Sequence, residues 1–254
     1  MSVDLHTLRP GDDGRTPLVL LHAFPVDSRM WTAVAPLITA GTPVLAVDLP
    51  GMGTAPLPDA EPSIEAAADA VAAVLPGPAV IAGLSMGGYV ALALAERRPE
   101  LVRALGLLDT KAVADTDEAA ANRRRIADQA EQGGTVDPVR PMADALLGET
   151  TRHTRPELVE QLAEWIDAQS PAGIAWSQRA MASRPDRTAV LRGWSAPVLV
   201  LVGAEDGPTP PEQAAAMAGE LGIEPVVVPA AGHLTAVEQP PAVADALNAL
   251  IARV

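Results

Sequence analysis

The most informative motif of this sequence is Gly83-Leu84-Ser85-Met86-Gly87-Gly88. It follows the apolar run 79–82, which has the length of a strand, and leads into the apolar segment 88–98, which has the length of a helix. A nucleophile on so sharp a strand-to-helix turn has a strained backbone, so the positions two residues away must lack side chains. The hydroxyl then stands above the sheet, and N–H groups at the helix start face any developing negative charge. We therefore predict that Ser85 is a nucleophile; a small-residue turn for close packing is the alternative.

Short apolar runs alternate with helix-length segments along the rest of the chain. The runs are continuous rather than alternating in polarity, as expected for strands that are covered on both faces. The strand-like runs are 18–21, 44–47, 79–82, 104–108, 198–202 and 225–228. The helical segments between and after them are 64–75, 88–98, 211–221 and 241–252. This order predicts an α/β fold with a mostly parallel, doubly wound sheet.

One region breaks this rhythm, because no strand-like run occurs between residues 110 and 195. Helical segments separated by glycine and proline take their place, at 116–132, 141–147, 155–169 and 172–183. An insertion at the carboxyl ends of parallel strands lies over the place where such sheets bind ligands. We therefore predict a core of residues 1–110 and 195–254 and a helical cap or lid of residues 111–194. A helical subdomain packed on one side of the core is the alternative.

The predicted nucleophile needs a base, because a serine hydroxyl is a weak nucleophile at its own pKa. His233 lies in a loop after the last strand-like run, and the glycine before it lets that loop bend toward the serine. We predict that His233 is this base, with an ordinary loop histidine as the alternative. Of the other histidines, His6 lies in a candidate N-terminal strand, His22 follows an early strand and His153 stands among arginines. We expect His6 and His22 to be structural and His153 to face solvent.

The base in turn needs a carboxylate that orients the imidazole and stabilises its charged form. Asp206 is our choice, because it follows the strand-like run 198–202 in a loop that turns into a helix. Two alternatives remain open. Glu205 is adjacent in the chain, and Asp109 ends the preceding core strand.

An oxyanion hole needs two N–H donors aimed at one point. One should be Met86, directly after the nucleophile at the start of the helix. The other should come from the turn His22-Ala23-Phe24-Pro25, where a small residue at 23 lets the backbone turn and the Phe24 N–H faces the site.

These motifs closely resemble the α/β-hydrolase superfamily, over almost the whole chain. They are Leu-His-Ala-Phe-Pro at 21–25, Asp-Leu-Pro-Gly-Met-Gly at 48–53, Gly-Leu-Ser-Met-Gly-Gly at 83–88, Gly-Ala-Glu-Asp at 203–206 and Ala-Gly-His at 231–233. The chain order Ser85, Asp206, His233 is also that of the family. Within it, the chain looks like small bacterial arylesterases with perhydrolase side activity, cofactor-free haloperoxidases and 3-oxoadipate enol-lactonases. The family usually has glycine where Ala23 stands, and alanine restricts the backbone at this position more than glycine does.

The resemblance and the residues together imply hydrolysis of carboxylic esters of small or medium acyl groups through an acyl-serine. A lactonase of the enol-lactone type is one alternative, with a cap arginine from 122–125 or Arg152 binding a substrate carboxylate. A ligand-binding homologue with an idle triad is another. Candidate substrate-binding residues of the cap are Met142, Leu146, Trp165, Trp176 and Met181, although such an apolar stripe can simply be core.

The amino-acid composition limits the classes of partner that we expect for this chain. The chain has 18 Lys and Arg against 32 Asp and Glu, a net charge of −14, which disfavours nucleic acid and anionic membranes as partners. It has no cysteine, which excludes disulfides and thiolate ligands, and no start typical of a signal peptide. No metal or organic cofactor is implied. We expect a cytoplasmic protein, monomeric or homodimeric, that acts on a small-molecule ester or lactone.

Overall fold

The computed structural model describes residues 3–254 and forms one seven-stranded sheet. Its strands are β1 (Asp4–Arg9), β2 (Leu18–Leu21), β3 (Val44–Asp48), β4 (Ala79–Leu84), β5 (Val102–Leu108), β6 (Val198–Gly203) and β7 (Val226–Val228). They lie in the order β1-β3-β2-β4-β5-β6-β7, in which β1 is antiparallel to β3 and the other described pairs are parallel. The predicted mostly parallel sheet is confirmed. Met1 and Ser2, at the start of the predicted core, lie outside the described residues.

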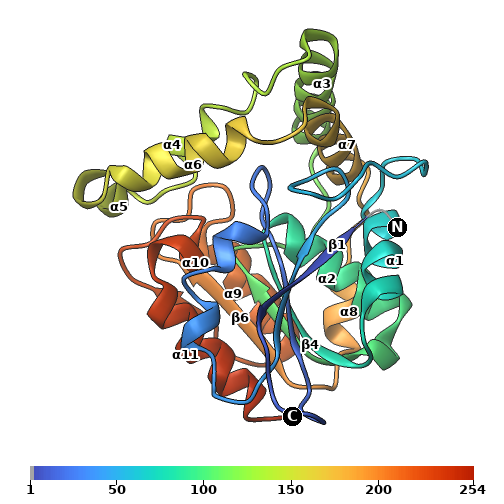
Figure 1. The fold of residues 1–254 in the computed structure, drawn as a ribbon, viewed down its shortest axis with the longest axis vertical. Helices are drawn as coiled ribbons and strands as arrows, with labels where there is room; N and C mark the ends of the chain where they lie inside the picture. The colour runs from blue at the N-terminus through green and yellow to red at the C-terminus, as the bar shows by residue number, and fades with distance from the viewer. Residues whose placement is uncertain (1–2) are drawn as a thin grey trace.

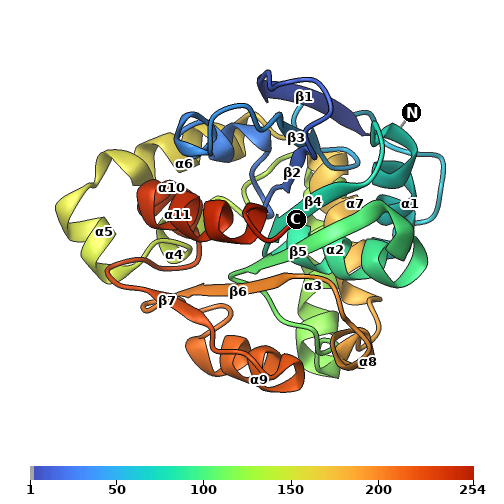
Figure 2. The same cartoon turned by 90° about the horizontal axis from the view of Figure 1, so that it is seen from below.

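Helices cover both faces of the sheet (Figures 1 and 2). Those outside the predicted cap are α1 (Ile64–Val74), α2 (Met86–Arg97), α9 (Pro211–Leu221), α10 (Thr235–Glu238) and α11 (Pro240–Ile251), with short 3-10 turns at Ser28–Trp31, Ala35–Leu37 and Pro99–Leu101. α2 packs on β4 and β5 and beside α1, whereas α11 packs on β5 and β6. Figure 2 shows α2 and α9 on one side of the sheet and α10 and α11 on the other. The sheet is therefore doubly wound, as the alternating pattern predicted.

Local signals in the sequence explain where several helices begin and end. The Ser63 side chain accepts a hydrogen bond from the Ala66 N–H and caps α1. α9 begins at Pro211, whose missing N–H costs nothing in a first turn, and ends before Gly222 in the left-handed conformation.

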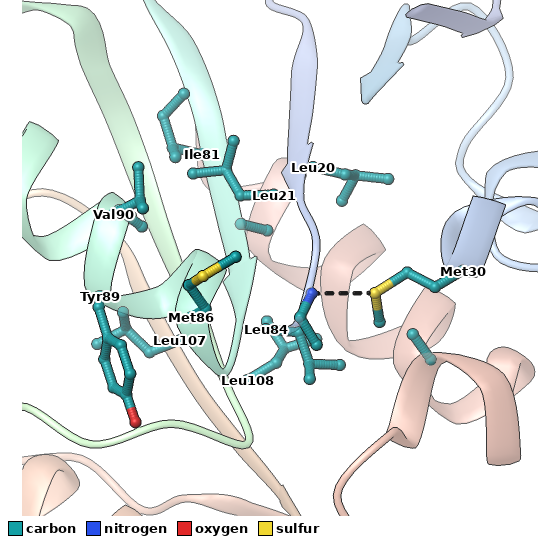
Figure 3. Close-up of a cluster of buried hydrophobic side chains, with 14 of the residues drawn as sticks. Leu20, Leu21, Met30, Ile81, Leu84, Met86, Tyr89, Val90, Leu107 and Leu108 are labelled. Atoms are coloured by element: carbon teal, nitrogen blue, oxygen red, sulfur yellow. Dashed lines mark hydrogen bonds between the residues drawn. The ribbon is translucent and has the colours of Figure 1, made fainter. Parts of the chain in front are cut away.

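The central strands are buried on both faces, which is why their sequences are almost entirely apolar; Asp48, at the end of β3, is a buried exception. Every residue of β2, β3, β4 and β6 is buried. Figure 3 shows Leu20 and Leu21 of β2, Ile81 of β4 and Leu107 of β5 in one cluster with Val90 of α2. This packed layer supports the bend between β4 and α2 at which Ser85 stands.

The segment between β5 and β6 is helical. Its helices are α3 (Asp117–Gly133), α4 (Met142–Ala145), α5 (Glu149–Thr154), α6 (Glu157–Asp167), α7 (Pro171–Ala182) and α8 (Thr188–Arg192). α3 packs along α7, and α4 packs against α6. In Figure 1 the helices α3 to α7 form a layer above the sheet, whereas α8 lies beside α2. The boundaries of a separate cap domain at 111–194 stay a prediction. None of the helices within residues 3–254 combines the length and the apolar character needed to cross a bilayer.

Candidate active site

Ser85 stands at the bend between β4 and α2, on a strained backbone. Its φ of 55° and ψ of −113° lie outside the regions that residues with a side chain ordinarily adopt. A Cβ on Gly83 would collide with the carbonyl of Gly87, and a Cβ on Gly87 would collide with the carbonyl of Leu21. The Ser85 N–H donates to the Leu108 carbonyl at 2.9 Å, which ties the bend to β5. Close backbone contacts that glycine permits therefore hold the serine above the sheet.

The Ser85 hydroxyl lies within hydrogen-bond distance of His233. Oγ is 2.8 Å from Nε2, and Nδ1 is 2.9 Å from each carboxylate oxygen of Asp206. A carboxylate can only accept, so Nδ1 carries the imidazole proton and Nε2 is left to accept the serine proton. The exposed fractions of the three residues are 9% for Ser85, 3% for His233 and 3% for Asp206. The arrangement can act as nucleophile, general base and orienting acid.

Asp206 is held in place by its own loop. The Thr209 N–H donates to Oδ1 at 2.9 Å, and the Thr209 hydroxyl donates to Oδ2 at 2.8 Å. The adjacent alternative, Glu205, points instead to the insertion, where it accepts a hydrogen bond from the Thr150 N–H at 2.8 Å. Of the two neighbouring carboxylates, Asp206 is therefore the one that contacts the imidazole.

The second alternative, Asp109, lies behind the triad at the end of β5. Oδ1 accepts from the Gly203 N–H at 2.9 Å, and Oδ2 accepts from the Thr235 hydroxyl. Complete burial and the nearby charge of Asp206 raise the pKa of Asp109 well above its ordinary value. Asp109 thus connects the end of β6 to the segment that follows His233, and it does not replace Asp206 at the imidazole.

The three remaining histidines are engaged elsewhere. His22 is fully buried; its Nε2 accepts from the Leu49 N–H at 2.9 Å and its Nδ1 donates to the carbonyl of the next residue. Burial lowers the pKa of His22, so the ring is neutral near pH 7 and joins the ends of β2 and β3. His6 Nε2 lies 3.0 Å from Asp48 Oδ2, and His153 bonds to the backbone of its own helix on the surface.

The two expected oxyanion donors are Phe24 and Met86. Neither main-chain N–H donates to an acceptor within residues 3–254, and Met86 is the first residue of α2, where N–H groups lack helical partners. The Ala23 N–H donates to Met30 Sδ at 3.2 Å (Figure 3). Ala23 is not among the residues with positive φ, so alanine is accommodated there without backbone strain. The oxyanion hole itself stays a prediction.

A cavity of about 90 Å³ lies beside Ser85 and His233. Its other lining residues are Phe24, Tyr89, Lys111, Arg123, Met142, Leu146, Met181, Pro208 and Thr209. Three of the five candidate wall residues, Met142, Leu146 and Met181, are in this lining. The structure does not bring the other two there: Trp165 lies under the Arg29 guanidinium at 5.8 Å, and the indole N–H of Trp176 donates to the Ala60 carbonyl at 3.3 Å.

Sequence reasoning missed two polar residues of this lining, Tyr89 and Lys111. Tyr89 follows Ser85 by four residues, and one helical turn places such residues on the same face. Lys111 comes three residues after the end of β5, at the carboxyl edge of the sheet where ligands bind. Both signals were therefore present: a helical spacing from the nucleophile and a position just beyond a core strand.

A buried carboxylate joins the loop 231–234, here called the histidine loop, to the insertion. Glu238 Oε1 accepts from the N–H groups of Gly232 at 2.9 Å and Leu234 at 3.2 Å. Oε2 accepts from the Gly148 N–H, just before α5, at 2.9 Å. The loop that carries the base and the junction between α4 and α5 are thus one hydrogen-bonded unit.

Comparison with known proteins places these features in context. Residues 18–246 match the model of the alpha/beta hydrolase family. The chain is 34% identical over 213 residues to a pimeloyl-[acyl-carrier protein] methyl ester esterase of Neisseria meningitidis serogroup C, a match that covers 78% of each chain. It is 32% identical over 182 residues to lipase LipV of Mycobacterium tuberculosis, which covers 69% of this chain and 67% of the lipase.

Solved structures show the same relationship. A thermophilic esterase from Thermogutta terrifontis, with malate bound, superposes with a TM-score of 0.91 at 36% identity, over 98% of this chain and 93% of the esterase. The enol-lactonase from Burkholderia xenovorans LB400 superposes with a TM-score of 0.85 at 22% identity, over 98% and 96% of the two chains. The second similarity extends to the fold alone.

Proposed function

This chain belongs to the alpha/beta hydrolase family, and from that premise we propose that it is a serine hydrolase of carboxylic esters. Its identities of 34% and 36% with two esterases support ester hydrolysis. The observation that carries the serine mechanism is the 2.8 Å separation between Ser85 Oγ and His233 Nε2. The cavity of about 90 Å³ is small beside the ~300–1,000 Å³ of common ligand sites, which favours a small acyl group.

In the acylation step, Ser85 Oγ attacks the ester carbonyl carbon while its proton passes to His233 Nε2. A tetrahedral intermediate forms, with the carbonyl electron pair on oxygen. When that pair re-forms the double bond, the carbon–alcohol bond breaks and the alcohol leaves with the proton from Nε2. The acid part is now esterified to Ser85.

Deacylation repeats the same steps with water. His233 Nε2 takes one proton from a water molecule, and the water oxygen attacks the acyl carbon. The bond to Ser85 Oγ then breaks, Oγ recovers the proton from Nε2, and the free acid departs. Asp206 faces Nδ1 throughout and stabilises the imidazolium that exists in both halves of the reaction.

The negative oxygen of each tetrahedral intermediate needs donors that are already in place. The N–H groups of Met86 and Phe24 are our candidates, since both are unused by other acceptors within residues 3–254. Removing one such donor from a comparable site costs roughly 10²–10³ in kcat.

A lactonase would use the same three residues, whereas a ligand-binding homologue would not. In a lactonase the attack on the carbonyl opens the ring, and the leaving hydroxyl stays attached to the acyl group. In a ligand-binding homologue the triad would be idle, although the buried, hydrogen-bonded geometry of Ser85, His233 and Asp206 favours the enzyme.

The test is the hydrolysis of p-nitrophenyl butyrate by the parent chain, Ser85→Ala and Ser195→Ala. Ser195 is an exposed serine before β6 and serves as the matched control. We expect Ser85→Ala to lose kcat by roughly 10⁴-fold or more, as triad removal does elsewhere, and Ser195→Ala to equal the parent. Near-parent turnover in folded Ser85→Ala would rule the proposal out.

A further inference from the structure

The wall of the Ser85 cavity carries two cations, Lys111 and Arg123, with side chains 20% and 23% exposed. Both contact one carboxylate, that of Asp115: Lys111 Nζ lies 3.1 Å from Oδ1, and Arg123 Nε donates to Oδ2 at 2.6 Å. A third cation, Arg184, lies 2.8 Å from the same Oδ2. Within this group, three positive charges face the single negative charge of Asp115, so two positive charges are not balanced by it, in a protein whose net charge is −14.

The buried partner of Asp115 is Arg184, whose side chain is 2% exposed. Its guanidinium stacks on the Tyr89 ring at 4.0 Å and donates to the carbonyls of Met181 and Val113. Burial alone would raise the pKa of Asp115, but hydrogen bonds from Arg184 and the charge of Arg123 hold that pKa below its usual range. Arg184 thus balances Asp115, and the charges of Lys111 and Arg123 remain for the cavity.

Hydrogen-bond donors of this group are also left over. Arg123 Nη1 donates to Gln178 Oε1 at 3.2 Å, whereas Arg123 Nη2 and the Tyr89 hydroxyl donate to no acceptor within residues 3–254. Burial raises the pKa of Tyr89, so its hydroxyl keeps its proton. Figure 3 shows that hydroxyl pointing away from the apolar cluster.

A solvated basic helix face does not account for Arg123. Its neighbour Arg124 is exposed, and Arg125 bonds to Gln129 and Asn122 on the outer face of α3. Among these three arginines, Arg123 is the one that lines the cavity. A guanidinium, an ammonium and a hydroxyl that converge on one small cavity are the donors that recognise a carboxylate.

We propose that Lys111, Arg123 and Tyr89 form a carboxylate subsite, so that the preferred substrate is a short ester that also carries an ionised carboxylate. This inference rests on the proposed ester hydrolysis at Ser85. The carboxylate can stand in the acid part or in the alcohol part of the ester, and the same three donors would bind it. The small cavity limits the link between carboxylate and ester group to a few carbon atoms.

The experiment compares kcat/KM for three esters, followed by acid release in a pH-stat. Monomethyl glutarate carries its carboxylate in the acid part, 3-acetoxypropanoate carries it in the alcohol part, and dimethyl glutarate is neutral. We expect one of the two anionic esters to exceed the neutral ester by about 10- to 100-fold, the size of one charged hydrogen-bond partner. Raising NaCl from 0.05 to 0.5 M should shrink that ratio, because the cations are partly exposed.

Substitutions test whether Arg123 and Lys111 cause the preference for the anionic ester. Arg123→Gln should lower the ratio of anionic to neutral kcat/KM by about tenfold. Arg124→Gln removes the same charge one residue along α3, outside the cavity, and should leave the ratio at the parent value. Lys111→Gln provides a second variant should Arg123→Gln fail to fold, as judged by its thermal midpoint.

The outcomes separate the two proposals. If the parent hydrolyses the neutral ester through Ser85 but prefers neither anion, the carboxylate subsite is wrong and ester hydrolysis stands. The same holds if Arg123→Gln and Lys111→Gln both keep the parent ratio. If no ester is hydrolysed and a fluorophosphonate leaves Ser85 unlabelled, the proposed function fails and takes the subsite with it.

Discussion

Replacing Glu238 by glutamine should release the insertion from the histidine loop while the loop keeps its own bonds. In the parent, Oε1 accepts from two N–H groups of the loop, those of Gly232 and Leu234, and Oε2 accepts from the Gly148 N–H alone. Glutamine offers one accepting oxygen and one donating NH₂ group. The glutamine oxygen should take the position of Oε1, where it accepts from both Gly232 and Leu234. The NH₂ group then faces the Gly148 N–H, so two donors point at each other where the parent has a hydrogen bond.

The structure sets the size of the effect. Glu238 is fully buried, so water cannot repair the opposed donors. A hydrogen bond to a charged acceptor contributes about 1.5–3 kcal/mol, and a buried unsatisfied donor costs about 1–3 kcal/mol. We expect Glu238→Gln to lose about 3 kcal/mol of unfolding free energy, which for a chain of this length is about 6–12 °C in Tm. The main-chain N–H of His233 donates to the carbonyl of Leu146 in the insertion at 2.9 Å, so releasing the insertion should also lower kcat, by less than about tenfold.

Urea unfolding, thermal unfolding and amide exchange at Gly148 measure these changes. Glu205→Gln is the matched control, since the Glu205 carboxylate also contacts the insertion, accepting from the N–H and the hydroxyl of Thr150. That site is exposed, and a glutamine can both accept from the N–H and donate to the hydroxyl, so its loss should stay below about 1 kcal/mol. A Glu238→Gln chain as stable as Glu205→Gln, with unchanged exchange at Gly148, would refute this reasoning.

Three further changes test other parts of the account. Thr209→Val removes the 2.8 Å bond to Asp206 Oδ2 and should lower kcat on p-nitrophenyl butyrate by about 2- to 10-fold, with KM unchanged; parent kcat would show that this bond positions nothing. Gly87→Ala drives a Cβ into the Leu21 carbonyl and should lower kcat by more than ~10²-fold or Tm by several degrees; parent values in both assays would contradict the tight bend. Burial alone would raise the pKa of Asp48, but His22, which becomes protonated in acid, and hydrogen bonds from the Thr54 and Ser28 N–H groups hold it at about 2. A lowered pKa stabilises the folded state above the unfolded value near 3.8, and this stabilisation is lost as pH falls toward 2. Between pH 5 and 2, urea unfolding should therefore show that the parent loses about 1–2 kcal/mol more unfolding free energy than Asp48→Asn. Parallel pH curves for the two chains would contradict this.

Most of the fold follows from local pattern. The apolar runs 18–21 and 198–202 coincide with β2 and β6, because strands buried on both faces must be apolar throughout. The pattern gave no sign of α5 and α8, whose six and five residues are too short to show a helical period. The antiparallel pairing of β1 was equally out of reach, since strand direction depends on partners far along the chain.

The site divides in the same way. Ser85 and His233 could be chosen from sequence, because the residues around each are informative. Glycines flank the serine at the predicted bend, and a glycine precedes the histidine in a loop after the last strand. Glu238 could not, since a glutamate reads as a surface residue until the three backbone N–H groups that surround it are known. Trp165 looked like a wall residue because it is large and apolar, yet its ring lies beneath Arg29, a contact across 136 residues of sequence.

Labelling of the folded chain by a fluorophosphonate, read by peptide mass, tests whether Ser85 is a nucleophile that His233 activates. The serine mechanism predicts a single adduct on Ser85 in the parent, and loss of that adduct when His233 is replaced by alanine, because Oγ then has no base 2.8 Å away. A folded parent that takes no adduct at Ser85, or that labels at the same rate without the imidazole, would contradict it.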